Sequence, residues 1–489
     1  MSERPLLNIV IEDKLQETPG IRYALTHISN WLGLKPNFAL NPDPDGLNFY
    51  YGSDKSVEGF QITINASNFW DNGIFGKKGA PELPCLWESN EIILITCENE
   101  LIVPYIGGTE PPYLRFNGKQ LSTNLDFVAS IFFFLSGYEQ RIDPVSDESG
   151  RYDYRRSFAF RTCSLRRPLV NEYLEVLRYY LSKIDPSFSF PYPLGDKPVF
   201  FLSHDVDVIR KYCWKYLLRR IGADIFSLRF SDLIRLFTEF YRVKSGKIGD
   251  PFYCFSQLLE IERELHLESS FYFFGIDRPF SSNVCYGPDS LARLAHYLER
   301  NGREVGLHFS EQSIHSSKKL RAEKALLEST CKASVIGGRS HYLRFIIPET
   351  PRHLTQAGFS YDASVGCAQV PGFASSVCYP YKLYDVDRNC ELPLWEIPLT
   401  VMDGTLKDYL ALDPEQAKLQ MDRLFLVCTR YRGVFSLLWH NSSLFDFRWQ
   451  DYRDVYQQFL KKVAGSGIIS QTGAGIIRLL ESSQLASRL

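Results

Sequence analysis

The stretch Phe201–Asp207 reads FLSHDVD and brings one imidazole and two carboxylates to the end of an apolar, strand-like run. Ionisable groups are costly to remove from water, so a fold that gathers them beside a buried strand either pairs them or uses them. Asp205 and Asp207 are two residues apart, so on a strand they share one face and His204 lies on the other. One carboxylate can then bind a metal ion while the other acts as a base, although an isolated pair more often forms a cap or a salt bridge.

Strand-like and helix-like patterns alternate along the chain after this stretch. Apolar runs such as SSFYFFG (269–275) and EVGLH (304–308) are separated by amphipathic runs such as PDSLARLAHYLERNG (288–302). Repeated strand–helix units predict a parallel sheet or barrel, in which functional groups gather at the carboxyl ends of the strands. A lone histidine at such a place is more often a core residue than a ligand, but here a set of polar residues stands at successive strand ends: Asp205, Asp207, His308, Arg339, Asp362 and His440.

The first third of the chain has its own alternation of patterns. LNIVIE (7–12), EIILITC (91–97) and ELIVPYIGG (100–108) predict strands, and IRYALTHISNWLGL (21–34) predicts an amphipathic helix. The segment Pro186–Pro198 carries four prolines and cannot continue a helix. A chain of 489 residues is too long for one ordinary core. The sequence therefore predicts an α/β domain over 1–190 and a second α/β domain over 191–489.

Composition and charge narrow the function classes. The chain is 45% hydrophobic and 23% charged, with a net charge of −2, so no overall field draws it to nucleic acid or to an anionic membrane. The longest apolar run, FVASIFFFL (127–135), is far shorter than the ~20 residues of a membrane span. Residues 1–15 show no signal-peptide pattern, and the 11 cysteines contain no CxxC pair. We therefore expect reduced thiols, no membrane span and a cytoplasmic location.

Several of these stretches, in this order, resemble motifs of the polysaccharide deacetylases, the NodB-homology class of metal-dependent carbohydrate esterases. The resemblance covers about Lys197 to Gln458, and the stretches that carry it are SHDVD (203–207), EVGLHFS (304–310), GRSHYLRF (338–345), AGFSYDASVG (357–366), EIPLTVMD (396–403) and LLWHN (437–441). The preceding region looks like the N-terminal domain of unknown role found in a subgroup of bacterial proteins with a deacetylase-like domain. The stretches behind this second resemblance are YYG (50–52), DFVASIFFFLSGYEQ (126–140) and residues 149–174.

The resemblance implies a distorted (β/α) barrel preceded by a smaller α/β domain. It also implies hydrolysis of the linear amide bond of an N-acetyl, or related acyl, group on a sugar or glycan, with a divalent metal as cofactor, for which we expect Zn²⁺. Carried over by motif, Asp205 matches the catalytic base, and Asp207 and His308 match metal ligands. Arg339 matches the residue that orients the base, and His440 matches the general acid. Asp362 falls in the family's following Asp motif.

Three positions depart from the family pattern. A second metal-binding histidine is expected four residues after His308, but Gln312 stands there. Relatives carry proline where this chain has His341, which shares a strand face with Arg339, so we predict that His341 completes the metal site. His204 and His315 are the alternatives. In addition, the subgroup's Gly-Phe-Arg is Gly-Phe-Ala here, at residues 372–374.

Two other functions are compatible with the same motifs. One is a catalytically silent sugar-binding protein on a deacetylase scaffold, which would bind its ligand without a metal. The other is a structural member of a glycan-assembly complex, in which the region before residue 185 provides the docking part. Metal content and acetate release from N-acetylated sugars distinguish both from an active hydrolase.

Overall fold

The computed structural model describes residues 4–53, 58–71, 85–108, 113–187, 190–226, 230–275 and 286–485. Its larger sheet has the strand order β14-β15-β13-β12-β11-β10-β9-β17-β16, with β18 also pairing with β9. All pairs are parallel except β14–β15. The strands are β9 (Val199–Asp205), β10 (Ser269–Phe273), β11 (Glu304–Phe309), β12 (Gly337–Ser340), β13 (Tyr361–Asp362), β14 (Tyr381–Asp385), β15 (Cys390–Glu396), β16 (Val401–Met402), β17 (Val434–Leu438) and β18 (Ile469–Ser470).

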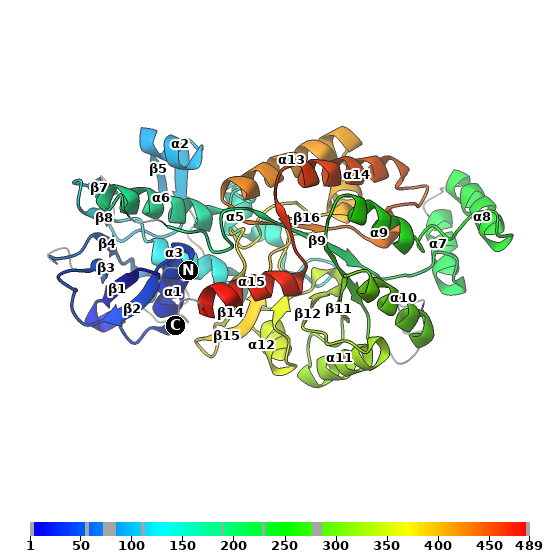
Figure 1. Cartoon of the computed structure of the whole chain (residues 1–489), viewed down its shortest axis with the longest axis horizontal. Coiled ribbons are helices and arrows are strands. Elements are labelled where there is room, and N and C mark those ends of the chain that lie inside the picture. The colour runs from blue at the N-terminus through cyan, green and yellow to red at the C-terminus, as the bar shows by residue number, and fades with distance from the viewer. Residues whose placement is uncertain are drawn as a thin grey trace.

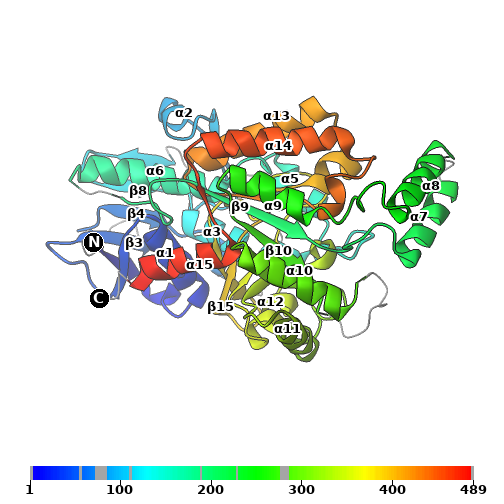
Figure 2. The same cartoon turned by 45° about the vertical axis from the view of Figure 1, so that its right-hand side comes forward.

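Helices connect the strands from β9 to β13 and from β16 to β18, and they cover the sheet (Figures 1 and 2). They are α9 (Phe255–Glu264), α10 (Pro288–Arg300), α11 (Ser317–Cys331), α12 (Glu349–Gln356), α13 (Pro414–Arg430), α14 (Gln450–Gly465) and α15 (Gly473–Leu485). Among the described strands, the two edge strands β14 and β16 do not pair with each other, so the sheet is open rather than closed into a barrel. The sheet is also curled. The predicted strand–helix array is thus confirmed as a mixed α/β structure whose sheet curls like half a barrel.

Strand β9 is an interior strand, paired with β10 and β17, and is buried along its whole length. Phe200 and Leu202 belong to the main core, whereas Val199 and Phe201 pack in a second cluster with Ile476 of α15. This division follows from the alternation of side chains along a strand. The face of β9 that carries Phe201 continues through Asp205 at the end of the strand. The alternation thus places Asp205, a predicted site residue, on the same strand face as these packed apolar side chains.

The N-terminal part of the chain forms a second sheet with the order β2-β1-β3-β4-β8-β7, beside the antiparallel pair β5–β6. The strands are β1 (Leu6–Ile11), β2 (Lys35–Ala39), β3 (Leu47–Gly52), β4 (Ile62–Asn65), β5 (Cys85–Glu88), β6 (Glu100–Val103), β7 (Leu114–Phe116) and β8 (Leu121–Thr123). The accompanying helices are α1 (Pro19–Trp31), α2 (Asn90–Thr96), α3 (Phe127–Leu135), α4 (Tyr138–Ile142), α5 (Phe158–Arg161) and α6 (Leu169–Ile184).

The two sheets share one continuous hydrophobic cluster. Tyr23 of α1 donates a 2.5 Å hydrogen bond to the backbone carbonyl of Lys382 in β14, and its ring lies 4.8 Å from that of Tyr384. The division at residues 190 and 191 therefore stays a prediction, and residues 188 and 189 of the proline-rich segment lie outside the described residues. None of the described helices is both long and apolar enough to cross a membrane.

The predicted strand EIILITC is wrong, because these residues form helix α2. Ser89 caps the helix by accepting a 3.2 Å hydrogen bond from the backbone N–H of Ile92. Ile92 and Thr96 are buried, whereas Ile93 and Leu94 are 45% and 76% exposed. Burial thus follows the four-residue spacing of a helix face, which overrides the β-branched composition of the run.

Candidate functional site

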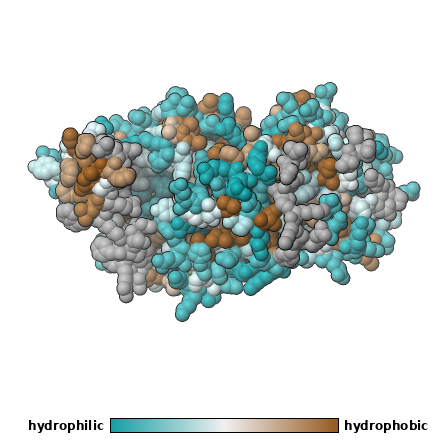
Figure 3. Space-filling model, turned by 180° about the vertical axis from the view of Figure 1, so that it is seen from behind, coloured by the Kyte–Doolittle hydropathy of each residue, from teal (hydrophilic) through white to brown (hydrophobic). Residues whose placement is uncertain are grey.

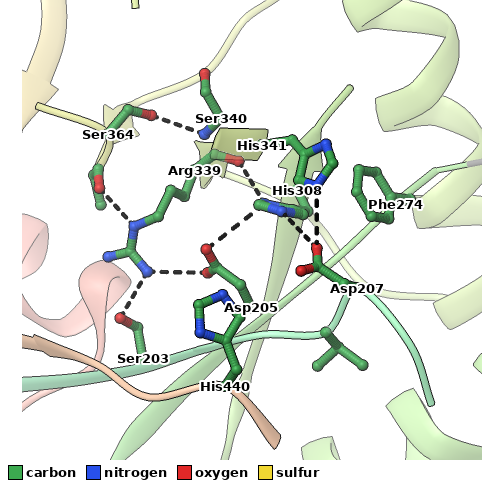
Figure 4. A network of polar contacts seen from close by, with 12 residues as sticks. Ser203, Asp205, Asp207, Phe274, His308, Arg339, Ser340, His341, Ser364 and His440 are labelled. Atoms are coloured by element: carbon green, nitrogen blue, oxygen red, sulfur yellow. Dashed lines mark hydrogen bonds and ion pairs between the residues drawn. The ribbon is translucent and has the colours of Figure 1, made fainter. Parts of the chain in front are cut away.

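The site lies at the carboxyl ends of the neighbouring strands β9, β10, β11 and β12 (Figure 4). His308 of β11 pairs in register with Arg339 of β12, and Asp205 ends β9 two strands away from β11. Gly338 allows this close pairing, because a Cβ there would lie 1.9 Å from the carbonyl oxygen of Leu307. Parallel strands therefore bring together residues that are separated by more than a hundred positions in the sequence.

Asp205 and Arg339 form a buried ion pair. Arg339 Nη1 lies 3.0 Å from Asp205 Oδ1, and the two residues are 0% and 3% exposed. Arg339 also donates from Nη1 to Ser203 Oγ at 2.8 Å and from Nε to the carbonyl oxygen of Ala363 at 2.7 Å. These bonds fix the guanidinium plane, so one oxygen of Asp205 is held in place while the other remains directed toward the histidines (Figure 4).

Asp207, His308 and His341 form the one group of potential metal ligands found among the described residues. Asp207 Oδ1 lies 3.2 Å from His308 Nε2 and 3.6 Å from His341 Nε2. His308 Nδ1 donates to the backbone carbonyl of Arg339 at 2.9 Å, because a carbonyl oxygen can only accept. In the neutral imidazole, Nε2 therefore carries a lone pair that faces the Asp207 carboxylate.

This arrangement calls for a positive charge between the three side chains. Asp207 Oδ1 has no hydrogen-bond partner in the described part of the chain, although the atom is buried. Burial opposes a charge on His308, yet its pKa is raised because Asp205 and Asp207 stabilise the imidazolium. Burial lowers the pKa of His341 to about 4, which keeps that imidazole neutral and able to act as a ligand. A carboxylate and two imidazoles fit a divalent cation such as Zn²⁺.

The backbone that presents His341 adopts an uncommon conformation. Tyr342 and Leu343, in the 3₁₀ turn His341–Leu343 after β12, have φ angles of 60° and 57°. Left-handed backbone at such residues costs of order 1–3 kcal/mol and is retained where its surroundings impose it. The Tyr342 ring stacks on His341 with 3.8 Å between ring centroids, and Glu311 Oε1 lies 3.5 Å from His341 Nδ1. These neighbours hold the imidazole toward Asp207.

The alternative third ligands lie elsewhere. His204 points to the opposite face of β9, where its ring nitrogens contact the carbonyl oxygen of Trp439 at 2.6 Å and Glu262 Oε1 at 2.9 Å. His315 is exposed and does not belong to the group of potential ligands, and Gln312 is exposed as well. The structure thus brings His341, rather than His204 or His315, to Asp207 and His308.

His440 reaches the site from β17, which pairs with β9 in parallel. Its Nδ1 lies 2.7 Å from Asp403 Oδ1, and its backbone N–H donates to Asp403 Oδ2 at 2.9 Å. Burial favours the neutral ring, but the charge and hydrogen bond of Asp403 outweigh it and raise the pKa of His440 to about 10. Asp403 ends the motif EIPLTVMD directly after β16, but its place beside His440 was not predicted from the sequence. A carboxylate at a strand end was the signal that could have found it.

Asp362 does not join this group. It ends β13, is fully buried, and accepts hydrogen bonds of 2.8 Å from the backbone N–H and the hydroxyl of Ser364. Burial raises the pKa of Asp362 and of its neighbour Glu396. Asp362 is not one of the described residues that line the cavity over the site. A catalytic role for Asp362 stays a prediction.

The site opens into a cavity of about 800 Å³. Asp205, Asp207, His308, His341 and His440 all face it. Its wall combines aromatic and cationic side chains, namely Tyr342, Tyr409, Phe447, Trp449, Arg151, Arg220, Arg235, Lys407 and Arg448. Rings beside polar groups suit a ligand that has both apolar faces and many hydroxyl groups.

Comparisons with known proteins give the following likenesses. Residues 9–186 match the model of a family of unknown function, DUF7033. No curated protein matches the sequence. One similar structure, from Mycobacterium smegmatis, is described as a "putative polysaccharide deacetylase"; it is 18% identical, with a TM-score of 0.41, over 61% of this chain and 93% of the other.

Two further solved structures are similar to this chain. A mutant of the peptidoglycan deacetylase PdaC from Bacillus subtilis is 13% identical, with a TM-score of 0.30, over 59% of this chain and 94% of the other. A CE4 family pseudoenzyme from Bacillus anthracis is 12% identical, with a TM-score of 0.27, over 58% and 66% of the two chains.

Proposed function

We propose that this protein is a metal-dependent hydrolase that removes an N-acetyl, or related acyl, group from a sugar or glycan. The observation that carries the proposal is the convergence of three elements on one cavity. These elements are the Asp207–His308–His341 group, the buried pair Asp205–Arg339 and the pair His440–Asp403. A ligand set, a positioned base and a positioned acid are the parts that metal-assisted amide hydrolysis needs.

Asp207, His308 and His341 would hold the cation, which we propose is Zn²⁺. A divalent cation at this place supplies Lewis-acid chemistry to an acyl carbonyl and to water. The hydrogen bond from His308 Nδ1 to the Arg339 carbonyl fixes the orientation of the ligand nitrogen. Glu311 Oε1 lies 3.5 Å from Nδ1 of the second imidazole, His341, and its negative charge favours an N–H on that nitrogen.

Asp205 is the proposed general base. Its Oδ1 is held by Arg339, so Oδ2 stays available to accept a proton from water at the mouth of the metal group. Burial of the pair keeps bulk water from competing for the carboxylate. Because Arg339 makes two further hydrogen bonds, the base is oriented before the substrate arrives.

His440 is the proposed general acid. Asp403 binds Nδ1, so the other ring nitrogen is the one that can donate a proton into the cavity. A pKa of about 10 keeps the ring protonated at neutral pH. Because β17 adjoins β9, His440 approaches from a different strand than the metal group, and its proton can reach the leaving amine.

The proposal is tested by acetate release from a panel of N-acetylated sugars, nucleotide sugars and oligosaccharides, with the full-length protein before and after chelation and Zn²⁺ addition. We expect release that stops on chelation and returns with Zn²⁺. If the protein binds sugars tightly but releases no acetate with Zn²⁺ bound, the silent sugar-binding function replaces hydrolysis. Binding by the Asp205→Asn variant provides the matched control, because this change leaves the metal ligands in place.

A further inference from the structure

A helical hairpin lies at the end of the molecule opposite the N-terminal sheet (Figures 1 and 2), and several of its apolar side chains are exposed. It consists of α7 (Trp214–Phe226) and α8 (Phe230–Lys244). Figure 3 shows apolar side chains gathered at this end of the molecule. The side chains of the hairpin surface are 51% to 91% exposed, and they are Leu218, Ile225, Phe226, Phe230, Ile234, Phe237 and Tyr241.

The exposed apolar residues of α8 lie in one stripe along the helix. Phe230, Ile234, Phe237 and Tyr241 follow one another at spacings of four, three and four residues. At about 100° per residue, these positions fall within roughly 60° of one another around the helix axis. Such a stripe normally faces a core or a partner, since isolated exposed apolar residues show no such spacing.

The hairpin already has a core of its own, which the exposed stripe does not form. Leu217 and Leu236 are buried against Tyr212 between the two helices. Two ion pairs attach the hairpin region to the rest of the protein: Lys211 to Asp446 at 2.7 Å and Arg448 to Asp224 at 2.7 Å. The apolar stripe is therefore a surface that is left over after the hairpin has folded and packed.

The exposed charges beside this stripe are basic. Arg242, Lys244 and Lys247 are exposed on α8 and in the turn after it. Over residues 217–247, the described carboxylates are turned inward and at most 25% exposed: Asp224 and Asp232 pair with Arg448, and Glu239 pairs with Lys211. The outward surface of the hairpin thus combines apolar side chains with uncompensated positive charge.

We propose that the α7–α8 hairpin docks on an anionic membrane surface. The apolar stripe enters the boundary between headgroups and acyl chains, and the arginine and lysine side chains contact lipid phosphates. The net charge of −2 gives the whole chain no long-range attraction to such a surface, so docking depends on this local arrangement. A second copy of the chain fits less well, because a two-fold contact would bring the same cations face to face.

Docking through the hairpin also holds the cavity close to the membrane surface. Arg220 of α7 and both Asp232 and Arg235 of α8 line the same cavity as His308 and His440. A hairpin seated on a bilayer therefore places the cavity wall next to the membrane surface. This inference goes beyond the proposed hydrolysis and does not depend on it, because vesicle binding is measured without turnover.

Co-sedimentation of the full-length protein with vesicles tests the proposal. We expect binding to vesicles of phosphatidylcholine mixed with phosphatidylglycerol, little binding to phosphatidylcholine alone, and weaker binding as salt is added. Ile234→Ser with Phe237→Ser should lower the partition coefficient roughly tenfold or more, because two apolar side chains lose their place in the lipid. Arg242→Glu with Lys244→Glu should also weaken binding to the anionic vesicles, without changing the melting temperature.

Matched controls are available on other helices. Leu419→Ser with Leu426→Ser removes two exposed apolar side chains from α13, and Lys318→Glu with Lys319→Glu reverses two exposed charges on α11. Both controls should bind vesicles as the parent protein does. The proposal is wrong if the parent binds neither kind of vesicle, or if hairpin variants and controls bind alike. It is also wrong if light scattering without vesicles shows a dimer that Ile234→Ser with Phe237→Ser dissociates.

Discussion

The Nδ1 atom of His308 donates to the backbone carbonyl oxygen of Arg339 across 2.9 Å, and this bond turns Nε2 toward Asp207. Arg339, which is proposed to orient the base, thus also orients a proposed metal ligand through its backbone carbonyl. The two functions share one backbone segment, because His308 and Arg339 are register partners in neighbouring strands. Metal binding and positioning of the base should therefore be sensitive to the same stretch of β12.

Zn²⁺ should stabilise the protein through Asp207 and His308. A cation at a free concentration of 100 times its Kd adds about 2.7 kcal/mol to the free energy of unfolding. We expect Zn²⁺ to raise the melting temperature of the parent protein, and Asp207→Ala and His308→Ala to abolish both this rise and the bound metal. An unchanged melting temperature with Zn²⁺, together with metal-free purified protein, would contradict the assignment.

His341 should behave as the third ligand. We expect His341→Ala to weaken Zn²⁺ binding at least about tenfold, because the change removes one of three donors that lie within 4.8 Å of one another. His315→Ala is the matched control, since this exposed histidine is not part of the group. Competition with a chromogenic chelator measures both affinities, and equal values for the two variants would exclude His341 as a ligand.

The alkaline limit of activity should depend on Asp403. Burial works against protonation of His440, but Asp403 raises its pKa to about 10, so turnover should fall only as the pH approaches that value. Asp403→Asn removes the charge, and the limit should move toward the ordinary histidine pKa of about 6.5. The pH profile of kcat/KM for both proteins checks this shift. A profile with the same alkaline limb in both would rule out His440 as the acid.

The same pair links folding stability to pH. The folded pKa of His440, about 10, is higher than the value of about 6.5 expected in the unfolded chain. The proton therefore stabilises the folded state fully below pH ~6.5, and this contribution is lost as the pH rises through about 10. Urea unfolding at a series of pH values should show this decline in the parent and a smaller one in His440→Gln.

Much of the site could be predicted because its residues stand at the ends of recognisable strands. The runs VFFLS, EVGLH and VFSLL are apolar and short, and each ends close to a polar residue that the structure places at the cavity: Asp205, His308 and His440. The third metal ligand was harder to predict. Gln312 stands where the family motif has a histidine, so the ligand has to come from another strand. The structure brings His341 to Asp207 and His308 through a left-handed turn, and no sequence pattern predicted this turn.

Other features could not be predicted, because they depend on contacts between distant segments. Asp403 acquires its role only because β16 pairs with β17 and so brings it to His440. Asp362 sits at a strand end like the others, but its carboxylate is engaged by Ser364. Helix α2 was mistaken for a strand since β-branched composition is a weak guide without knowledge of which face is buried.

Arg339 should be essential for stability as well as for activity. Removing one partner of a buried ion pair leaves an uncompensated charge and typically costs about 3–5 kcal/mol. Arg339→Met removes the guanidinium that holds Asp205, Ser203 and Ala363, so we expect a loss of that size in urea unfolding. Arg423→Met, at an exposed position of α13, is the control and should change stability little. Restoration of stability by the double variant Arg339→Met with Asp205→Asn would show that the unpaired carboxylate is the cause.

Asp205→Asn separates the proposed base from the metal site. The amide is nearly isosteric with the carboxylate and its oxygen can still accept the hydrogen bond from Arg339. The charge on Arg339, left without its counter-ion, should lower the free energy of unfolding, but the fold and the Asp207–His308–His341 group should persist. An amide cannot take a proton from water, and turnover should fall by roughly 10²–10⁴-fold, the usual contribution of a general base. Zn²⁺ content and sugar affinity should stay at the parent level, which a merely structural role for Asp205 would not produce. Parent-level acetate release by this variant would show that another group performs the proton transfer, and the assignment of Asp205 would have to be given up.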